Sequence, residues 1–200
     1  MVEVIARAEQ YLRSRFYEQL VEHVFISEVL QEAWFRFGKT VEVLRSEIDT
    51  AGYDVVLECN GVVRHVQLKT STEDARTARQ LVNIALADKP SGCVVWLVRT
   101  EHSQSCRMQL RYRFFGNGPG EPLPSLEAFP VAKHTKADSK GVKTERPAIR
   151  QVPKSQFEEL GSATELLGRL FGLGQYEFAA AAGPVRVWGH RWASSARHGG

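Results

Sequence analysis

The dipeptide Asn60-Gly61 constrains the fold of this chain more than any other feature of its sequence. It separates two segments rich in β-branched and apolar residues, 53–59 and 62–69. A two-residue turn of this composition is typical of a β-hairpin, because both of its residues must adopt a positive φ. In this hairpin Cys59 faces Val62, and counting outward along both strands places Asp54 opposite Gln67.

The hairpin brings an acid, an amide and a lysine to one face. Lys69 lies two residues beyond Gln67 and therefore projects from the same side of its strand, within diagonal reach of Asp54. The other face is expected to be the core face. It is apolar except for Arg64, and its members are Tyr53, Val55, Leu57, Cys59, Val62, Val66 and Leu68.

These three polar residues suit metal-assisted phosphate chemistry. The Asp54 carboxylate and the Gln67 amide oxygen are hard ligands for Mg²⁺ or Mn²⁺, and the backbone carbonyl of Leu68 would complete the ligand set. The metal would polarise a phosphate and activate water. Lys69 would position or deprotonate that water, or stabilise the charge developing on the phosphate. The alternative is that the three residues are only the solvated face of an antiparallel hairpin.

The surrounding pattern predicts an α/β fold with a mixed β-sheet flanked by helices. Residues 4–37 have helical periodicity, as one helix or as two that meet near residues 23–27. Strands are predicted at 41–45, 93–98 and 108–115, and a helix at 73–87. The run 93–98 is continuously apolar, which is typical of a central buried strand.

The C-terminal part of the chain is less regular. Residues 116–147 are rich in Gly, Pro, Ser and Lys and are expected to form a long basic loop. A short strand at 148–152 and a closing helix at 157–171 are predicted to follow. The expected domain therefore covers residues 1–173, and residues 174–200 are expected to be a disordered tail.

Two sequence strings resemble the PD-(D/E)XK nuclease superfamily: DTAGYDVVLE at residues 49–58 and VQLKTS at residues 66–71. The resemblance is to the branch in which Gln replaces the second acid, as in Mrr-type restriction enzymes, and it covers roughly residues 20–100. It implies a restriction-endonuclease-like core of αβββαβ order, with Asp54 and Gln67 as metal ligands and Lys69 as catalytic residue.

Many members of this superfamily also supply a glutamate from the helix that precedes the sheet. Glu28 is the expected residue, because it lies about a helix's length before Gly38, and Glu22 and Glu32 remain open as alternatives. Because Gln67 is uncharged, metal binding is expected to depend on such a glutamate.

The resemblance implies a Mg²⁺-dependent endonuclease that hydrolyses phosphodiester bonds in defence, restriction or repair. DNA is favoured over RNA as its substrate, and the sequence leaves the choice between them open. Enzymes of this class often act as homodimers, but the sequence locates no interface. One alternative is a weak or inactive nuclease-fold module that binds nucleic acid or a protein partner. Another is a structural subunit, for which a large exposed apolar patch would be the sign.

Further nucleic-acid contacts are expected from His65, Ser71, Arg111 and Arg113, since their positions extend the same surface. The net charge of +3 permits a nucleic-acid partner without requiring one. No apolar run approaches the ~20 residues that span a bilayer, so no membrane partner is expected. The odd number of cysteines, without a Cys-x-x-Cys pair, predicts a reducing cytoplasm.

Overall fold

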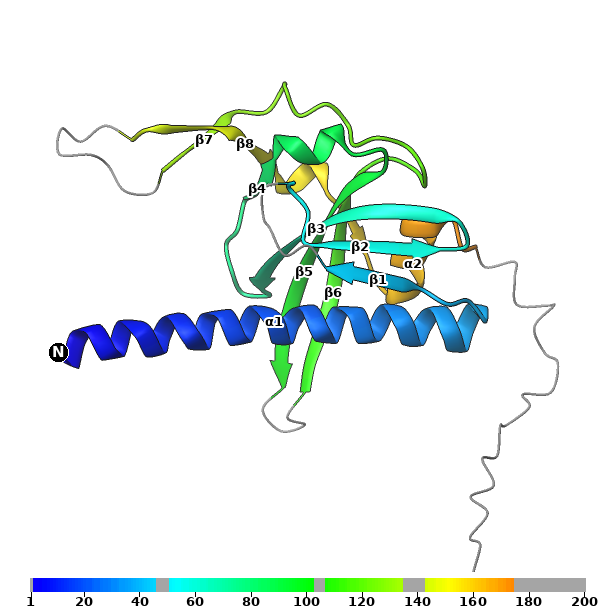
Figure 1. Cartoon of the computed structure of the whole chain (residues 1–200), viewed down its shortest axis with the longest axis horizontal. Helices are drawn as coiled ribbons and strands as arrows, with labels where there is room; N and C mark the ends of the chain where they lie inside the picture. Colours follow the sequence, from blue (N-terminus) through cyan, green and yellow to red (C-terminus); the bar gives the residue numbers. More distant parts are fainter. Residues whose placement is uncertain (1, 46–50, 103–106, 135–142, 175–200) are drawn as a thin grey trace, which may run out of the picture.

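The computed structural model describes residues 2–45, 51–102, 107–134 and 143–174. It begins with one continuous helix, α1 (Val2–Phe37), so the alternative of two helices meeting near residues 23–27 is wrong. The helix ends before Gly38, whose N–H donates to the carbonyl of Trp34 at 3.0 Å. At a rise of 1.5 Å per residue its 36 residues extend about 54 Å, beyond the sheet that it crosses (Figure 1).

A mixed six-stranded sheet forms the centre of the molecule, as the sequence predicts for an α/β fold. Its strand order is β1-β2-β3-β5-β6-β9, and only β3 and β5 are parallel neighbours. The strands are β1 (Glu42–Arg45), β2 (Val55–Cys59), β3 (Val62–Thr72), β5 (Gly92–His102), β6 (Arg107–Phe115) and β9 (Glu158–Leu160).

The hairpin of β2 and β3 has the predicted register. Cys59 pairs with Val62 and Val55 with Val66, and the turn residues Asn60 and Gly61 have φ of 56° and 80°. Gly61 suits this conformation because a Cβ would clash with its own backbone at such a φ. The predicted core face is buried at Val55, Leu57, Cys59 and Val66.

The helix predicted at 73–87 is wrong. The segment instead forms β4 (Arg79–Asn83) and the 3₁₀-helix η1 (Ile84–Asp88). Gln80 and Val82 are buried while Arg79 and Leu81 are exposed, which is the alternation of a strand with one covered face. The helical interpretation failed because β4 has a pairing partner that lies far away in the sequence.

That partner is β8 (Glu145–Pro153), which forms a second sheet with β4 and β7 (Val131–Lys133), in the order β4-β8-β7. The strand predicted at 148–152 is thus confirmed and longer than expected. The predicted 116–147 loop is wrong at β7 and at the start of β8. Figure 1 shows the β7–β8 pair projecting from the body on the same side as the N-terminal half of α1.

Two apolar clusters lie on opposite faces of the large sheet. The first packs α1 and α2 (Ala163–Phe171) against one face, and the second packs β4, η1 and β8 against the other. α2 is shorter than the helix predicted at 157–171, because β9 precedes it and Ser162 caps its N-terminus by accepting from the N–H of Glu165. The predicted tail lies beyond the described residues, except for Gly174.

Within the described ranges, no helix has the length and apolar character needed to cross a membrane.

Candidate active site between α1 and the β2–β3 hairpin

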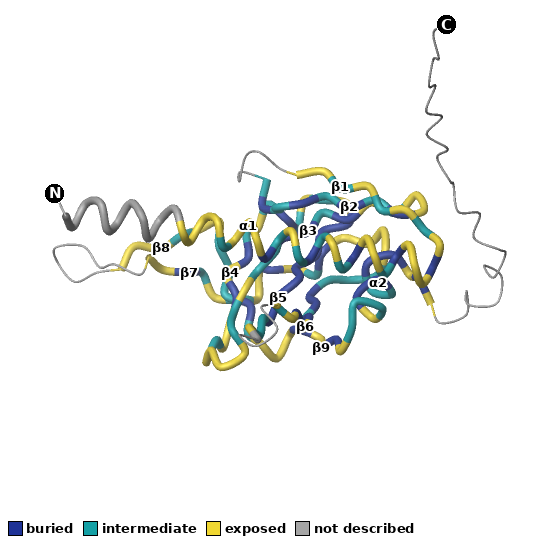
Figure 2. Tube along the Cα trace, turned by 90° about the horizontal axis from the view of Figure 1, so that it is seen from below, coloured by how far each residue is buried: buried dark blue, intermediate teal, exposed yellow. Residues whose placement is uncertain are grey.

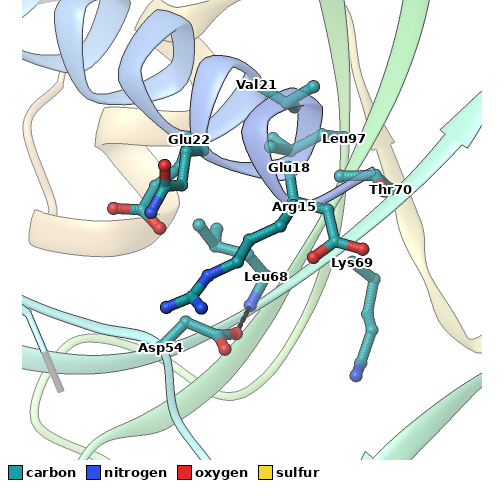
Figure 3. Close-up of a pocket in the computed structure, with 10 residues that line it drawn as sticks. Arg15, Glu18, Val21, Glu22, Asp54, Leu68, Lys69, Thr70 and Leu97 are labelled. Carbon is teal, nitrogen blue, oxygen red and sulfur yellow. Dashed lines mark hydrogen bonds between the residues drawn. The ribbon is translucent and has the colours of Figure 1, made fainter. Parts of the chain in front are cut away.

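A pocket of about 370 Å³ lies where α1 crosses the start of β2 and the middle of β3 (Figure 3). It combines acidic, basic and apolar side chains from four parts of the chain. They are Arg15, Glu18, Gln19, Val21, Glu22, Asp54, Leu68, Lys69, Thr70 and Leu97. Asp54 and Lys69 both line this pocket, beside the backbone of Leu68, but the Lys69 side chain extends away from α1 (Figure 3).

Asp54 is fixed by the backbone of β3. Its N–H donates to the carbonyl of Val66 at 2.9 Å, and its Oδ2 accepts from the N–H of Leu68 at 2.6 Å. β3 has eleven residues and β2 has five, so β3 continues past the end of its partner. The carboxylate of Asp54 satisfies a strand N–H at the point where the β2 ladder stops.

The turn before Asp54 depends on Gly52. This residue is buried with a φ of +77°, and a Cβ there would lie 3.0 Å from the backbone nitrogen of Leu86. Because Gly52 has no side chain, the turn packs closely against η1. This contact fixes the position of Asp54, two residues later, at the pocket.

Gln67 does not line this pocket. Its side chain is buried on the other face of the sheet, where Oε1 accepts from the N–H of Asn83 at 3.3 Å. The expected facing pair of Asp54 and Gln67 is not part of the β2–β3 ladder, which begins at Val55. Asp54 precedes the regular strand, so its side chain does not follow the alternation of the hairpin.

Glu28 does not line the pocket either. Its half-buried carboxylate accepts a hydrogen bond from the hydroxyl of Tyr112. Burial raises the pKa of Glu28, and the hydrogen bond from Tyr112 opposes that rise. Glu32, one of the alternatives, pairs with Arg36 and accepts from Thr164.

The helix acids that do line the pocket are Glu22, the other alternative, and Glu18, which the sequence reasoning did not consider. Glu22 also forms an ion pair with Arg45, with 2.7 Å between Glu22 Oε1 and Arg45 Nε. The buried positions of α1 recur every four residues from Val21 to Phe37. Glu22 therefore lies at the N-terminal end of the part of α1 that packs on the sheet.

The four residues expected to extend a nucleic-acid surface lie outside the pocket and have partners of their own. The His65 ring packs edge-on against Tyr53 at 5.0 Å, and burial, with a smaller effect of Lys89, lowers its pKa. Ser71 accepts from the indole N–H of Trp96 at 2.9 Å. Arg111 pairs with Glu73, and Arg113 with Glu159 at 2.8 Å.

The donors in the pocket have the chemistry that Mg²⁺ prefers. Asp54, Glu18 and Glu22 offer carboxylate oxygens and Gln19 an amide oxygen. Across the described parts of the chain, however, no three His, Cys, Asp or Glu side chains are grouped closely enough to hold an ion. Arg15 extends from α1 toward Asp54 (Figure 3). The side chains must therefore rearrange before they could enclose a cation.

Comparison with known proteins found no match to this chain among protein-family models, curated proteins or solved structures. The functional argument consequently depends on the residues of the site.

Proposed function

We propose that this chain is a metal-dependent nuclease with a restriction-endonuclease-like core, which hydrolyses phosphodiester bonds in DNA in defence, restriction or repair. The observation that carries the proposal is the shared pocket of Asp54, Lys69 and Glu22. Two of these residues come from the strings that resemble the nuclease superfamily, and the third is a glutamate from the helix before the sheet.

The topology around the pocket supports the same proposal. A helix is followed by the antiparallel strands β1, β2 and β3, and then by β5 parallel to β3. This is the order that the resemblance implies, except that β4 and η1 replace the expected helix in the crossover. The replacement leaves in place β3, which carries Lys69, and β2, which Asp54 immediately precedes.

The residues of this chain that would hold the metal are Asp54 and Glu22, with Glu18 and the Leu68 carbonyl as further oxygen donors. When bound, the metal would polarise the scissile phosphate and lower the pKa of a bound water. Gln67 is left out of this ligand set because its oxygen accepts from Asn83 on the other face.

Lys69 would act from the rim of the pocket, where its side chain extends away from α1 (Figure 3). Its ammonium would donate a hydrogen bond to a non-bridging phosphate oxygen and stabilise the negative charge that develops there. Charge stabilisation of this kind is typically worth two or three orders of magnitude in rate (~10²–10³).

The test is cleavage of supercoiled plasmid, a single-stranded DNA and a matched RNA by the purified chain in Mg²⁺, Mn²⁺ or EDTA. Metal-dependent DNA cleavage is expected, with a loss of at least ~100-fold in Lys69→Ala. Lys154→Ala is the matched control, because Lys154 is an exposed lysine outside the pocket. Cleavage that is unchanged in Lys69→Ala would refute the proposed site.

A second candidate is a module of the same fold that binds nucleic acid or a protein partner with little or no catalysis. Two observations favour it, because both weaken metal binding: Gln67 turns its amide oxygen away from the pocket, and the Arg15 guanidinium adds positive charge there. Salt-sensitive DNA binding without cleavage in any metal would support this alternative over the nuclease.

A further inference from the structure

The outer face of α1 carries a regular stripe of exposed side chains. Its members are Phe16, Leu20, His23, Ser27, Leu30 and Trp34, and each of them is exposed. Their successive spacings are 4, 3, 4, 3 and 4 residues, which is the heptad spacing of a helix that packs along another helix. Figure 2 shows exposed positions recurring along α1, in a helix whose buried residues face the sheet.

The apolar members of this stripe are large and open to solvent. Phe16 is 66% exposed and Trp34 57% exposed, although both belong to residue types that usually bury most of their surface. Exposed apolar patches of more than a few hundred Å² mark interaction surfaces on soluble proteins. The stripe is separate from the β2–β3 pocket, which Phe16 and Leu20 do not line.

The stripe is its own complement when one copy is turned end over end. With the two-fold axis level with Phe25, Phe16 faces Trp34 of the second copy and Leu20 faces Leu30. His23 then faces Ser27, so apolar residues meet apolar residues and the two polar positions meet each other. Phe25 itself is buried on the opposite side of the helix. Self-complementarity of this kind is what an isologous two-fold interface requires.

We infer that α1 pairs with α1 of a second copy of this chain through this stripe, as an antiparallel helix pair in a two-fold symmetric dimer. Each body packs on the inner side of its own α1. The two bodies therefore lie on opposite sides of the helix pair and do not obstruct it.

Charge selects the antiparallel arrangement over the parallel one. Arg13 is exposed and continues the stripe three residues before Phe16. The antiparallel pair places it beside the C-terminal end of the other α1, where the helix dipole is negative. A parallel pair would instead place Arg13 beside Arg13 and His23 beside His23, and it would align the two helix dipoles.

The available area is sufficient for a stable pair. A buried aromatic side chain removes about 150–250 Å² from water. The exposed parts of the four apolar members, Phe16, Leu20, Leu30 and Trp34, therefore offer roughly 450 Å² of apolar surface per copy. Stable interfaces bury about 600–1,000 Å² per partner, and the polar side chains that flank the stripe supply the remainder.

The test is the mass of the chain in solution, measured by sedimentation or light scattering over a range of concentrations. A mass of twice 22.5 kDa is expected at tens of micromolar. Leu30→Glu should raise the dimer dissociation constant at least tenfold. Leu81→Glu is the matched control, because Leu81 on β4 is exposed to the same degree (38% against 37%) and should leave the mass unchanged.

A wild-type chain that stays monomeric at 100 micromolar would overturn the inference, and so would a Leu30→Glu variant that dimerises as the wild type does. Circular dichroism of the variant confirms that the helix is retained. The orientation is tested by mixing Leu20→Cys with Leu30→Cys under oxidation, with the unmodified chain as control. Cross-linking in the mixture supports the antiparallel pair, whereas dimers of Leu20→Cys alone would overturn it in favour of a parallel pair.

Discussion

The carboxylate of Asp54 accepts a hydrogen bond from the backbone N–H of Leu68, with 2.6 Å between Oδ2 and the nitrogen. Asp54 therefore has a structural task, in addition to any chemical one, since it satisfies a strand N–H beyond the end of β2. Substitutions of Asp54 can separate the structural role from the chemical one, because Asn retains the hydrogen-bond acceptor and Ala does not.

Asp54→Asn keeps an oxygen that can accept from Leu68 but removes the negative charge. We expect thermal unfolding close to that of the wild type, with loss of metal binding and of cleavage. Asp54→Ala removes the acceptor as well and should cost about 1–3 kcal/mol of unfolding free energy. If Asp54→Asn cleaves DNA as well as the wild type does, Asp54 has only the structural task.

Glu22 and Glu28 are expected to differ in metal binding, because only Glu22 lines the pocket with Asp54. Glu22→Gln should weaken Mn²⁺ binding by at least ~10-fold, because the loss of even a group that only supports a metal ligand typically costs about 10–100-fold. Glu28→Gln should leave the affinity within about twofold of the wild type. Isothermal titration calorimetry measures both Mn²⁺ affinities. A larger loss of affinity in Glu28→Gln than in Glu22→Gln would indicate that Glu28, and not Glu22, binds the metal.

Glu28 should instead make stability depend on pH. Burial raises its pKa above the ordinary value of 4.5, so the folded state binds the Glu28 proton more tightly than the unfolded state does. This contribution to stability is complete below pH 4.5 and is lost as the pH rises through the raised pKa. Glu28→Gln cannot ionise and should lack this loss, which urea unfolding at pH 4 and at pH 7 would detect. An identical pH dependence in the variant would contradict the assignment.

Gly61→Ala should destabilise the hairpin through the backbone alone. No atom lies within 4 Å of the added Cβ, but φ is +80°, and an L-residue pays about 1–2 kcal/mol for a left-handed conformation. Gly174→Ala is the control, since its added Cβ also meets nothing and its φ is not positive. Equal unfolding free energies for the two variants would show that the positive φ at position 61 does not limit the stability of the hairpin.

The parts of the fold that depend on local pattern could be predicted from the sequence. The register of the hairpin follows from Asn60-Gly61, and the buried strand β5 follows from a continuous apolar run. β4 could not be predicted in this way, because β8, its partner, lies about 70 residues later. Local propensity carries no information about such a pairing.

The candidate site was likewise predicted only where its residues are close together in the sequence. Asp54 and Lys69 both line one pocket, although the Lys69 side chain extends away from α1 (Figure 3) and Gln67 lies on the other face of the sheet. The helix glutamate was placed wrongly, at Glu28 instead of Glu22. The turn of α1 that lies beside Asp54 depends on how far the helix extends beyond the sheet, which the sequence does not show. The position of Gln67 follows from η1 and Asn83, which belong to the segment that was expected to be a helix.

β5 lies between the two apolar clusters, and successive side chains enter opposite ones: Cys93, Val95 and Leu97 the first, Val94, Trp96 and Val98 the second. Removing either layer would expose one side of the same strand to water. Neither layer can therefore melt independently, and the domain should unfold as a single cooperative unit. The amide protons of β5 should be the last to exchange with solvent, since they are released only when the whole domain opens.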